Sequence, residues 1–155
     1  MTAKYSFQKY NNETMARALG RSLPISTRQS VEICNFVRGK NLEKAKNAMK
    51  RVIEKKQAVP YRIYNDGIGH KPGIGPGKYP VNACTQILQL IESAEANAQF
   101  KGLDSAKLVI AHLNAHQASR AWHYGRKRRR KMKRTNIEVV LEEQKTEEKQ
   151  NPDKK

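Results

Sequence analysis

The residues with the most distinctive chemistry form one short cationic run at positions 126–134. It reads Arg-Lys-Arg-Arg-Arg-Lys-Met-Lys-Arg, so eight of nine side chains are positively charged. Extended back to Arg120, the segment holds nine basic residues and no acidic one, which is +9 of the chain's formal +17. Charge of this density cannot be packed into a core, and no local acid balances it. A projecting cationic segment therefore indicates a polyanionic partner, and a nucleic acid first of all.

Aromatic rings accompany this charge immediately before Gly125. Trp122 and Tyr124 can stack on unpaired bases while neighbouring cations hold the backbone. The alternative for Trp122 is packing across the ribbon, and the sequence leaves both open. The candidate nucleic-acid contacts of the segment are Arg120, Trp122, Tyr124, Arg126, Lys127, Arg128, Arg129, Arg130, Lys131, Lys133 and Arg134.

A glycine-rich stretch at 66–80 is the second candidate site, with five glycines and three prolines. It matches no nucleotide-binding motif, because Gly77-Lys78 is followed by Tyr79 rather than Ser or Thr. No periodic pattern survives, so the stretch is predicted to be a loop. It is either a turn-rich linker or a loop whose backbone N–H groups approach RNA phosphates, with added charge from His70, Lys71 and Lys78.

Other reactive residue types give no sign of catalysis or metal binding. His112 and His116 share one face of a predicted strand, but neither cysteines nor an acidic cluster complete a metal site. RNA contact or ordinary hydrogen bonding is the favoured role of this pair. No nucleophile, base and orienting residue occur together. The sequence therefore predicts no enzyme activity, no cofactor and no small-molecule substrate.

Composition sets the broad class. The chain has 155 residues, 37% of them hydrophobic, and its mean hydropathy is −0.84. No apolar run reaches the roughly 18–20 residues that span a bilayer, and the N-terminus lacks the apolar segment of a signal peptide. A membrane-surface role would require an amphipathic basic helix, which the cationic run is not. Cys34 and Cys84 fall on apolar helix positions and are predicted to be core residues in an intracellular protein.

Three helices are predicted between the two ends of the chain. Ser26 and Gln29 form a capping box that opens the first, and Gly39 ends it. Asn41 caps the second, which must end before Pro60. Pro80 suits the first turn of the third. Its apolar stripe is Cys84, Ile87, Leu88, Ile91, Ala94 and Ala98, and Gly102 ends it.

Three strands flank these helices. Residues 15–23 alternate weakly. Residues 107–117 alternate with Leu108, Ile110 and His112 on one side. Residues 136–143 alternate cleanly, with Ile137, Val139 and Leu141 inward and Glu138 and Glu142 outward. The last two strands are predicted to pair as a hairpin with the cationic run at its tip.

The predicted fold class is α+β, with three helices packed on a small three-stranded antiparallel sheet and a long basic β-hairpin extension. One RNA-binding domain is expected over residues 1–143, with the hairpin at about 107–143 and its tip at 118–135. Residues 144–155 mix both charges without an apolar residue and are expected to form a disordered tail.

Several motifs in the same order resemble one known family over residues 15–143. That family is large-subunit ribosomal protein twenty-two in bacterial naming, seventeen in eukaryotic naming, in its archaeal and eukaryotic branch. The motifs are Arg17-Ala-Leu-Gly-Arg-Ser-Leu-Pro-Ile-Ser26, Val31-Glu-Ile-Cys, Val37-Arg-Gly-Lys-Asn-Leu-Glu-Lys-Ala45, Ala58-Val-Pro-Tyr-Arg62, Gly69-His-Lys, Gly73-Ile-Gly-Pro-Gly-Lys-Tyr-Pro80 and Ile137-Glu-Val-Val-Leu-Glu-Glu143.

The resemblance implies a structural protein of the cytoplasmic large ribosomal subunit that binds rRNA, supports subunit assembly and extends a hairpin toward the nascent-peptide exit tunnel. Its expected partners are large-subunit rRNA, neighbouring ribosomal proteins and the nascent peptide. An extraribosomal nucleic-acid-binding regulator or RNA chaperone is the alternative. The resemblance implies that eight residues face rRNA: Arg17, Arg21, Arg28, Arg38, Lys40, Arg62, Lys71 and Lys78.

The hairpin departs from the family pattern. Only eight residues separate His116 from Gly125, the proline expected in the ascending arm is absent, and the descending arm is almost wholly cationic. Gly125-Arg126 still matches the Gly-Arg of the family hairpin.

Overall fold

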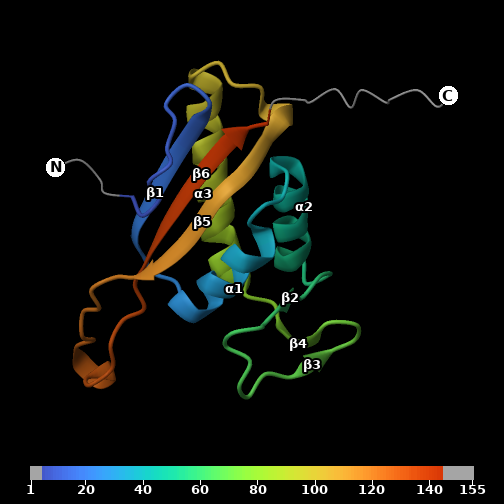
Figure 1. The fold of residues 1–155 in the computed structure, drawn as a ribbon. Helices are drawn as coiled ribbons and strands as arrows, with labels where there is room; N and C mark the ends of the chain where they lie inside the picture. Colours follow the sequence, from blue (N-terminus) through green and yellow to red (C-terminus); the bar gives the residue numbers. More distant parts are fainter. Residues whose placement is uncertain (1–4, 145–155) are drawn as a thin grey trace.

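A three-stranded antiparallel sheet forms one layer of the molecule. The computed structural model describes residues 5–144. Strands β1 (Met15–Leu23), β5 (Leu108–Gln117) and β6 (Thr135–Glu143) lie in the order β1-β6-β5, so the C-terminal strand is central. The predicted strands and the pairing of the last two are confirmed. The chain closes this sheet only when β6 enters between β1 and β5 (Figure 1).

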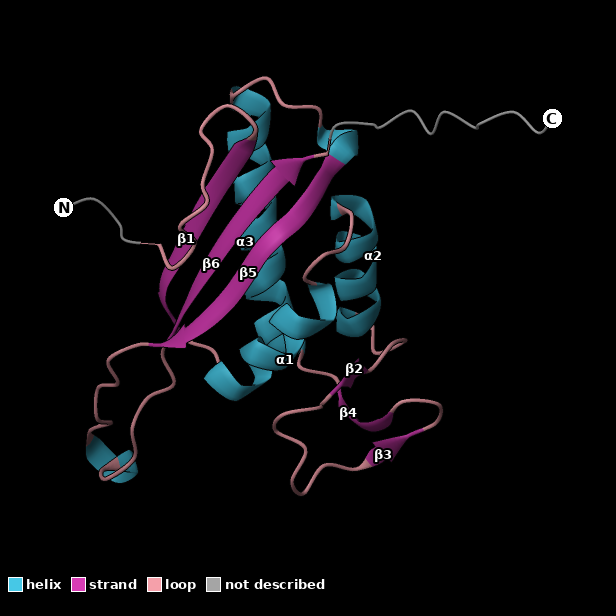
Figure 2. Ribbon diagram, in the orientation of Figure 1, coloured by secondary structure: helices cyan, strands magenta, loops and turns pink. Residues whose placement is uncertain are grey.

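The second layer consists of three helices on one face of the sheet (Figure 2). They are α1 (Thr27–Val37), α2 (Leu42–Ile53) and α3 (Val81–Phe100). Two short 3-10 turns lie outside this layer: η1 (Ser105–Lys107) precedes β5, and η2 (Gly125–Lys127) lies between β5 and β6. The long α3 lies along the sheet, because its predicted apolar stripe is buried throughout. The predicted α+β class is therefore confirmed.

The helix ends follow the sequence signals except at the starts of α1 and α3. The Asn41 side chain accepts a hydrogen bond from the Glu43 N–H at 3.0 Å. Gly39 and Gly102 follow their helices with φ of +76° and +79°, which glycine adopts readily. The predicted capping box is wrong, since the Ser26 side chain caps no N–H and Ser30 Oγ instead donates to the Ser26 carbonyl at 2.9 Å. Pro80 occupies the N-cap of α3 rather than its first turn.

One apolar core lies between the two layers. Its largest fully buried side chains come from all three helices and from β5 and β6: Ile33, Leu42, Met49, Ile87, Ile91, Leu108, Ile110, Leu113, Ile137 and Leu141. Cys34 and Cys84 are buried and unbonded to each other, as predicted, and burial raises the pKa of each thiol to about 12. No residue of 118–134 belongs to this core.

A β-bulge changes the alternation of β5. The register with β6 shifts between Ile110 and His112, so Leu108 and Ile110 face the core before the bulge and Leu113 and Ala115 face it afterwards. The prediction that His112 shares a face with Leu108 and Ile110 is therefore wrong. An extra residue in one strand moves all following side chains to the opposite face.

The predicted loop at 66–80 contains two strands of a second small sheet, which corrects that prediction. Strands β2 (Val59–Pro60), β3 (His70–Lys71) and β4 (Gly75–Lys78) pair antiparallel in the order β2-β4-β3. These strands are too short for a periodic pattern to show in the sequence. Gly73 and Gly75 have φ of +74° and +71°, which lets the chain turn between β3 and β4.

Candidate nucleic-acid interface

The cationic finger, defined here as residues 118–134, leaves the sheet at Gln117 and returns at Thr135. It projects from the end of the sheet beside α1 (Figure 1). Its two arms are joined by backbone bonds from Ala118 N–H to the Arg134 carbonyl, from Met132 N–H to the Ala121 carbonyl and from His123 N–H to the Arg130 carbonyl, at 3.2, 2.8 and 2.9 Å. The regular strands stop at the base, so the finger is a loosely bonded ribbon.

The charge of the finger is free to meet a partner. Eight of its nine cations are exposed, and Arg134 is half-buried. Within residues 5–144, the ion pairs formed by lysine and arginine side chains all lie outside the finger. Arg120 reaches across the ribbon and donates from Nε to the Met132 carbonyl at 2.9 Å. The field of these cations is therefore not cancelled by acids of this part of the chain.

The aromatic residues of the finger remain largely exposed. Lys131 Nζ lies 4.7 Å from the centre of the Trp122 ring, and the two residues face each other across the ribbon. Trp122 thus packs across the ribbon, yet 59% of it stays exposed. Packing across the ribbon therefore does not exclude stacking of this ring on an unpaired base. Tyr124 is 87% exposed.

The base of the finger is fixed to the start of α1. The buried Thr135 hydroxyl donates to the Ile25 carbonyl at 2.9 Å and lies 2.9 Å from the Thr27 hydroxyl. The Arg134 guanidinium donates to the Ser22 carbonyl at 3.3 Å. These contacts join residues more than 100 positions apart, and no local sequence signal predicts them.

This junction encloses a hollow of about 360 Å³, the cationic hollow. Arg28, Arg120, Lys133 and Arg134 line it, together with Ser26 and Thr27 at the first turn of α1, and none of its lining residues is acidic. The structure thereby brings predicted contact residues from two distant segments to one place. Four guanidinium or ammonium groups around one cavity favour a phosphate-sized anion.

A second hollow of about 220 Å³ adjoins the first and shares Ser26 and Arg28 with it. Its other lining side chains differ in kind, because most are aromatic or aliphatic. We call it the aromatic hollow; it is lined by Arg28, Tyr61, Ile63, Tyr64, Asp66, Ile68 and Lys78. The Arg28 guanidinium lies 5.7 Å from the centre of the Tyr64 ring.

The buried carboxylate of Glu32 holds this second hollow in shape. It accepts hydrogen bonds from three successive backbone N–H groups, those of Arg62, Ile63 and Tyr64, at 3.1, 2.8 and 2.7 Å. Glu32 is 1% exposed. Sequence reasoning missed it because a glutamate on a helix normally faces solvent, and its partners lie 30 residues away.

The remaining predicted contacts are dispersed, and several are engaged within the protein. The Arg17 guanidinium lies between the Tyr5 and Tyr10 rings, at 4.7 and 4.5 Å from their centres. Arg38 donates twice to the Leu113 carbonyl, at 2.7 and 3.2 Å. Lys40 lies 3.7 Å from the centre of the Phe36 ring, and burial lowers its pKa.

The other predicted body contacts lie at or near the surface. Lys71 is half-buried, 5.4 Å from the centre of the Tyr79 ring, whereas Arg62 and His70 are exposed. Arg21 is exposed beside β6, lining a hollow with His116 and Glu138.

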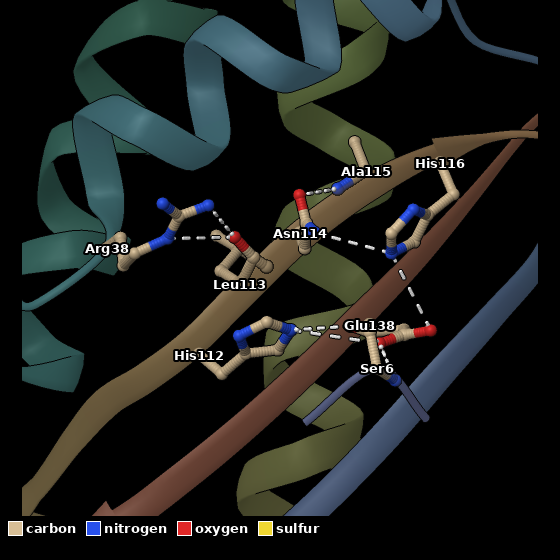
Figure 3. Close-up of polar contacts among 8 residues, drawn as sticks. All are labelled: Ser6, Arg38, His112, Leu113, Asn114, Ala115, His116 and Glu138. Carbon is tan, nitrogen blue, oxygen red and sulfur yellow. Dashed lines mark hydrogen bonds and ion pairs between the residues drawn. The ribbon is translucent and has the colours of Figure 1, made fainter. Parts of the chain in front are cut away.

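The histidine pair lies on the face of the sheet opposite the helices, around Glu138 (Figure 3). His112 Nε2 and His116 Nε2 lie 3.7 and 3.8 Å from the two Glu138 carboxylate oxygens. The prediction that both histidines share one face is confirmed. Burial lowers the pKa of His112, an effect that Arg38 and His116 reinforce and the Glu138 carboxylate opposes.

Glu138 points outward from the core, as predicted, but residues of the segment 5–14 cover it there. Ser6 donates to the Glu138 carboxylate from its N–H at 2.9 Å and from its hydroxyl at 2.6 Å. The Phe7 and His112 rings lie 5.3 Å apart. Glu138 is consequently only 7% exposed. Its strand position predicted the face correctly but could not reveal the segment above it.

No group of three or more His, Cys, Asp or Glu side chains between positions 5 and 144 could hold a metal ion. None of the helices in that range has the length and apolar character needed to cross a membrane.

The fold and this surface define a small, strongly basic α+β protein with a cationic finger and a cation-lined hollow at its base. Comparison with known proteins gives the family: residues 18–142 match the model of Ribosomal protein L22p/L17e, and the chain belongs to this family. Membership makes it a structural ribosomal protein rather than an enzyme.

Archaeal relatives support the assignment. The large ribosomal subunit protein uL22 of Methanopyrus kandleri is 39% identical over 145 residues, covering 88% of this chain and 91% of that protein. The uL22 protein of Methanosphaera stadtmanae is 40% identical, covering 90% and 96%. That of Thermoplasma acidophilum is 43% identical, covering 73% and 74%.

Proposed function

We propose that this protein binds rRNA as a structural component of the cytoplasmic large ribosomal subunit, with its finger inserted between RNA segments. The observation that carries the proposal is the finger itself. It holds nine cations and no acidic residue, and it contributes nothing to the apolar core. The family supports the same conclusion, since the relatives named above are large-subunit proteins. Release of counterions by Lys and Arg would supply most of the binding free energy.

The shape of the molecule agrees with this role. The finger and the β2-β4-β3 sheet project from the same end of the molecule, on either side of α1 (Figure 1). The cationic hollow lies at that end, where the finger meets α1. One end of the body can therefore contact RNA over a wide area, while the finger reaches further. Linking separate RNA segments in this way would support subunit assembly.

The finer part of the proposal is that the finger extends toward the nascent-peptide exit tunnel. The match of Gly125-Arg126 to the family hairpin supports it. A photo-crosslinking residue at position 124 should then reach rRNA and, in stalled ribosomes, the nascent peptide. The same residue at position 100, at the opposite end of the molecule, should reach neither nascent chain nor tunnel rRNA.

Sedimentation tests the main proposal. The tagged protein should migrate with the large subunit through a moderate-salt wash, and a variant with the finger cations changed to glutamine should be lost at lower salt. Complete loss of the unaltered protein under the same wash would instead favour an extraribosomal regulator or RNA chaperone.

A further inference from the structure

The two adjoining hollows at the start of α1 differ in chemistry. The charged residues that line the first are all cationic: Arg28, Arg120, Lys133 and Arg134. The exposed Tyr64 and Ile63 and the buried Tyr61 line the second. The second hollow has mixed charge, because Asp66 lines it together with Arg28 and Lys78, whereas four cations and no acid line the first. An anion is therefore directed to the first hollow and a planar, uncharged group to the second.

Their arrangement matches the two parts of one nucleotide. Arg28 and Ser26 belong to both hollows, so the cavities meet at these residues. A volume of about 220 Å³ is below the roughly 300 Å³ at which drug-sized pockets begin, which suits a single ring system rather than a larger ligand. Tyr64 offers a ring face, with the Arg28 guanidinium beside it, and bases stack on both kinds of surface.

We propose that these hollows form a binding site for one unpaired RNA nucleotide, with its phosphate in the cationic hollow and its base against Tyr64 in the aromatic hollow. This rests on the proposed RNA-binding function and adds a specific recognition element to it. Glu32 is a positioning residue here, because it fixes the backbone on both sides of Ile63. The finger provides sequence-independent attraction, whereas this site distinguishes an extruded base from a paired one.

Three short RNA hairpins test the inference: one fully paired, one with a single bulged 2-aminopurine, and one with an abasic bulge. The full chain should bind the 2-aminopurine hairpin roughly 5- to 150-fold more tightly than the other two, the range measured for one base–aromatic stack. The 2-aminopurine fluorescence should fall on binding as the base stacks.

The variants separate this site from general attraction. Tyr64→Leu should abolish the preference and the fluorescence change while leaving affinity for the paired hairpin unaltered. Tyr64→Phe should retain both, because the ring remains. Arg28→Gln should weaken binding to every hairpin and lower the salt slope by about one contact. Phe100→Leu, at an exposed ring outside the site, and Arg51→Gln, on the exposed face of α2, are the matched controls.

Several outcomes would overturn the inference. Equal, tight binding of all three hairpins by the unaltered protein would exclude the nucleotide site and leave the proposed function standing. A preference that survives Tyr64→Leu but disappears in Trp122→Leu would assign the base to the finger instead. Binding to none of the RNAs would refute the proposed RNA-binding function together with this site.

Discussion

At the scale of single residues, two buried acids carry constraints that join distant segments. Glu32 and Glu138 are 1% and 7% exposed in a chain whose formal charge is +17, yet neither pairs with a lysine or arginine side chain of residues 5–144. Glu32 binds backbone N–H groups, and Glu138 binds Ser6 and faces two histidines. Both carboxylates therefore fix the backbone of distant segments through hydrogen bonds, and they do not neutralise the cationic surface.

Removing the Glu32 carboxylate should destabilise the protein. Glu32→Ala loses three charge-assisted hydrogen bonds, and water can replace them only in part, so we expect a loss of about 2–4 kcal/mol in the free energy of unfolding by urea. Glu32→Gln should lose less, since one oxygen can still accept. Glu92→Gln, exposed on α3, is the control. A change in the free energy of unfolding within about 0.5 kcal/mol for Glu32→Ala would show that these three hydrogen bonds do not stabilise the fold.

His112 should make stability depend on pH. Burial lowers the pKa of its imidazole in the fold, so the unfolded chain binds protons first as the pH falls. The contribution of neutral His112 to the free energy of unfolding is present above the unfolded pKa of about 6.5 and is lost as the pH falls below that value. The free energy of unfolding should therefore fall between pH 7 and 5 more steeply in the unaltered protein than in His112→Gln. His70→Gln, exposed on β3, should keep the full slope; a similar slope in all three proteins would exclude this role.

At the scale of elements, the finger depends on the body more than the body depends on the finger. The base is held by Thr135, Arg134 and Asn136 against the end of β1 and the start of α1. Beyond it, few backbone bonds join the two arms. The finger contributes no residue to the apolar core. Mutual repulsion of its cations even opposes its compact form, since they lie within a Debye length of about 8 Å at physiological salt.

Replacing residues 119–134 with a short turn should leave a cooperative unfolding transition, with the free energy of unfolding changed by about 1 kcal/mol or less. Lost contacts at the base are offset by relief of charge repulsion and by a shorter loop. Ile137→Ala, at a fully buried position of β6, should by contrast cost about 2–5 kcal/mol. Thermal or urea unfolding of the shortened chain without a cooperative transition would show that the body requires the finger.

At the scale of the whole molecule, charge and core are separated. The apolar residues close one core between sheet and helices, whereas more than half of the net charge lies in a finger outside it. The finger, the cationic hollow and the β2-β4-β3 sheet lie at one end of the molecule, so we expect a polyanion to bind at that end (Figure 1). Salt dependence of RNA binding measures how much of this charge is used.

Binding to rRNA should weaken with salt at a log–log slope of roughly 0.7–0.9 per phosphate contact, and the finger should supply about four to seven contacts. Changing the cations of 126–134 to glutamine should then reduce the slope by roughly 3–6 units. Neutralising Lys44, Lys50 and Arg51 on the exposed face of α2 is the matched control and should change it much less. An unchanged slope after neutralising the finger would mean that the body carries the affinity.

The sequence by itself determined the features that arise from local physics. Helix and strand positions follow from the spacing of apolar residues, so the sequence predicts α3 and β6 together with their buried faces. The cationic finger is equally local, because no packing could hide nine cations in 15 residues. The family motifs are short contiguous runs and could be read in the same way.

Only the tertiary structure decided what depends on segments far apart in the chain. The bulge in β5 moves His112 away from the face that strict alternation gives it. Residues 5–14 bury Glu138, and residues 62–64 bury Glu32. The two hollows exist because Arg28 lies between the finger base and the segment that Glu32 holds. Each of these pairings joins residues far apart in the chain, and the free energy that selects it comes from contacts that exist only after the chain has folded.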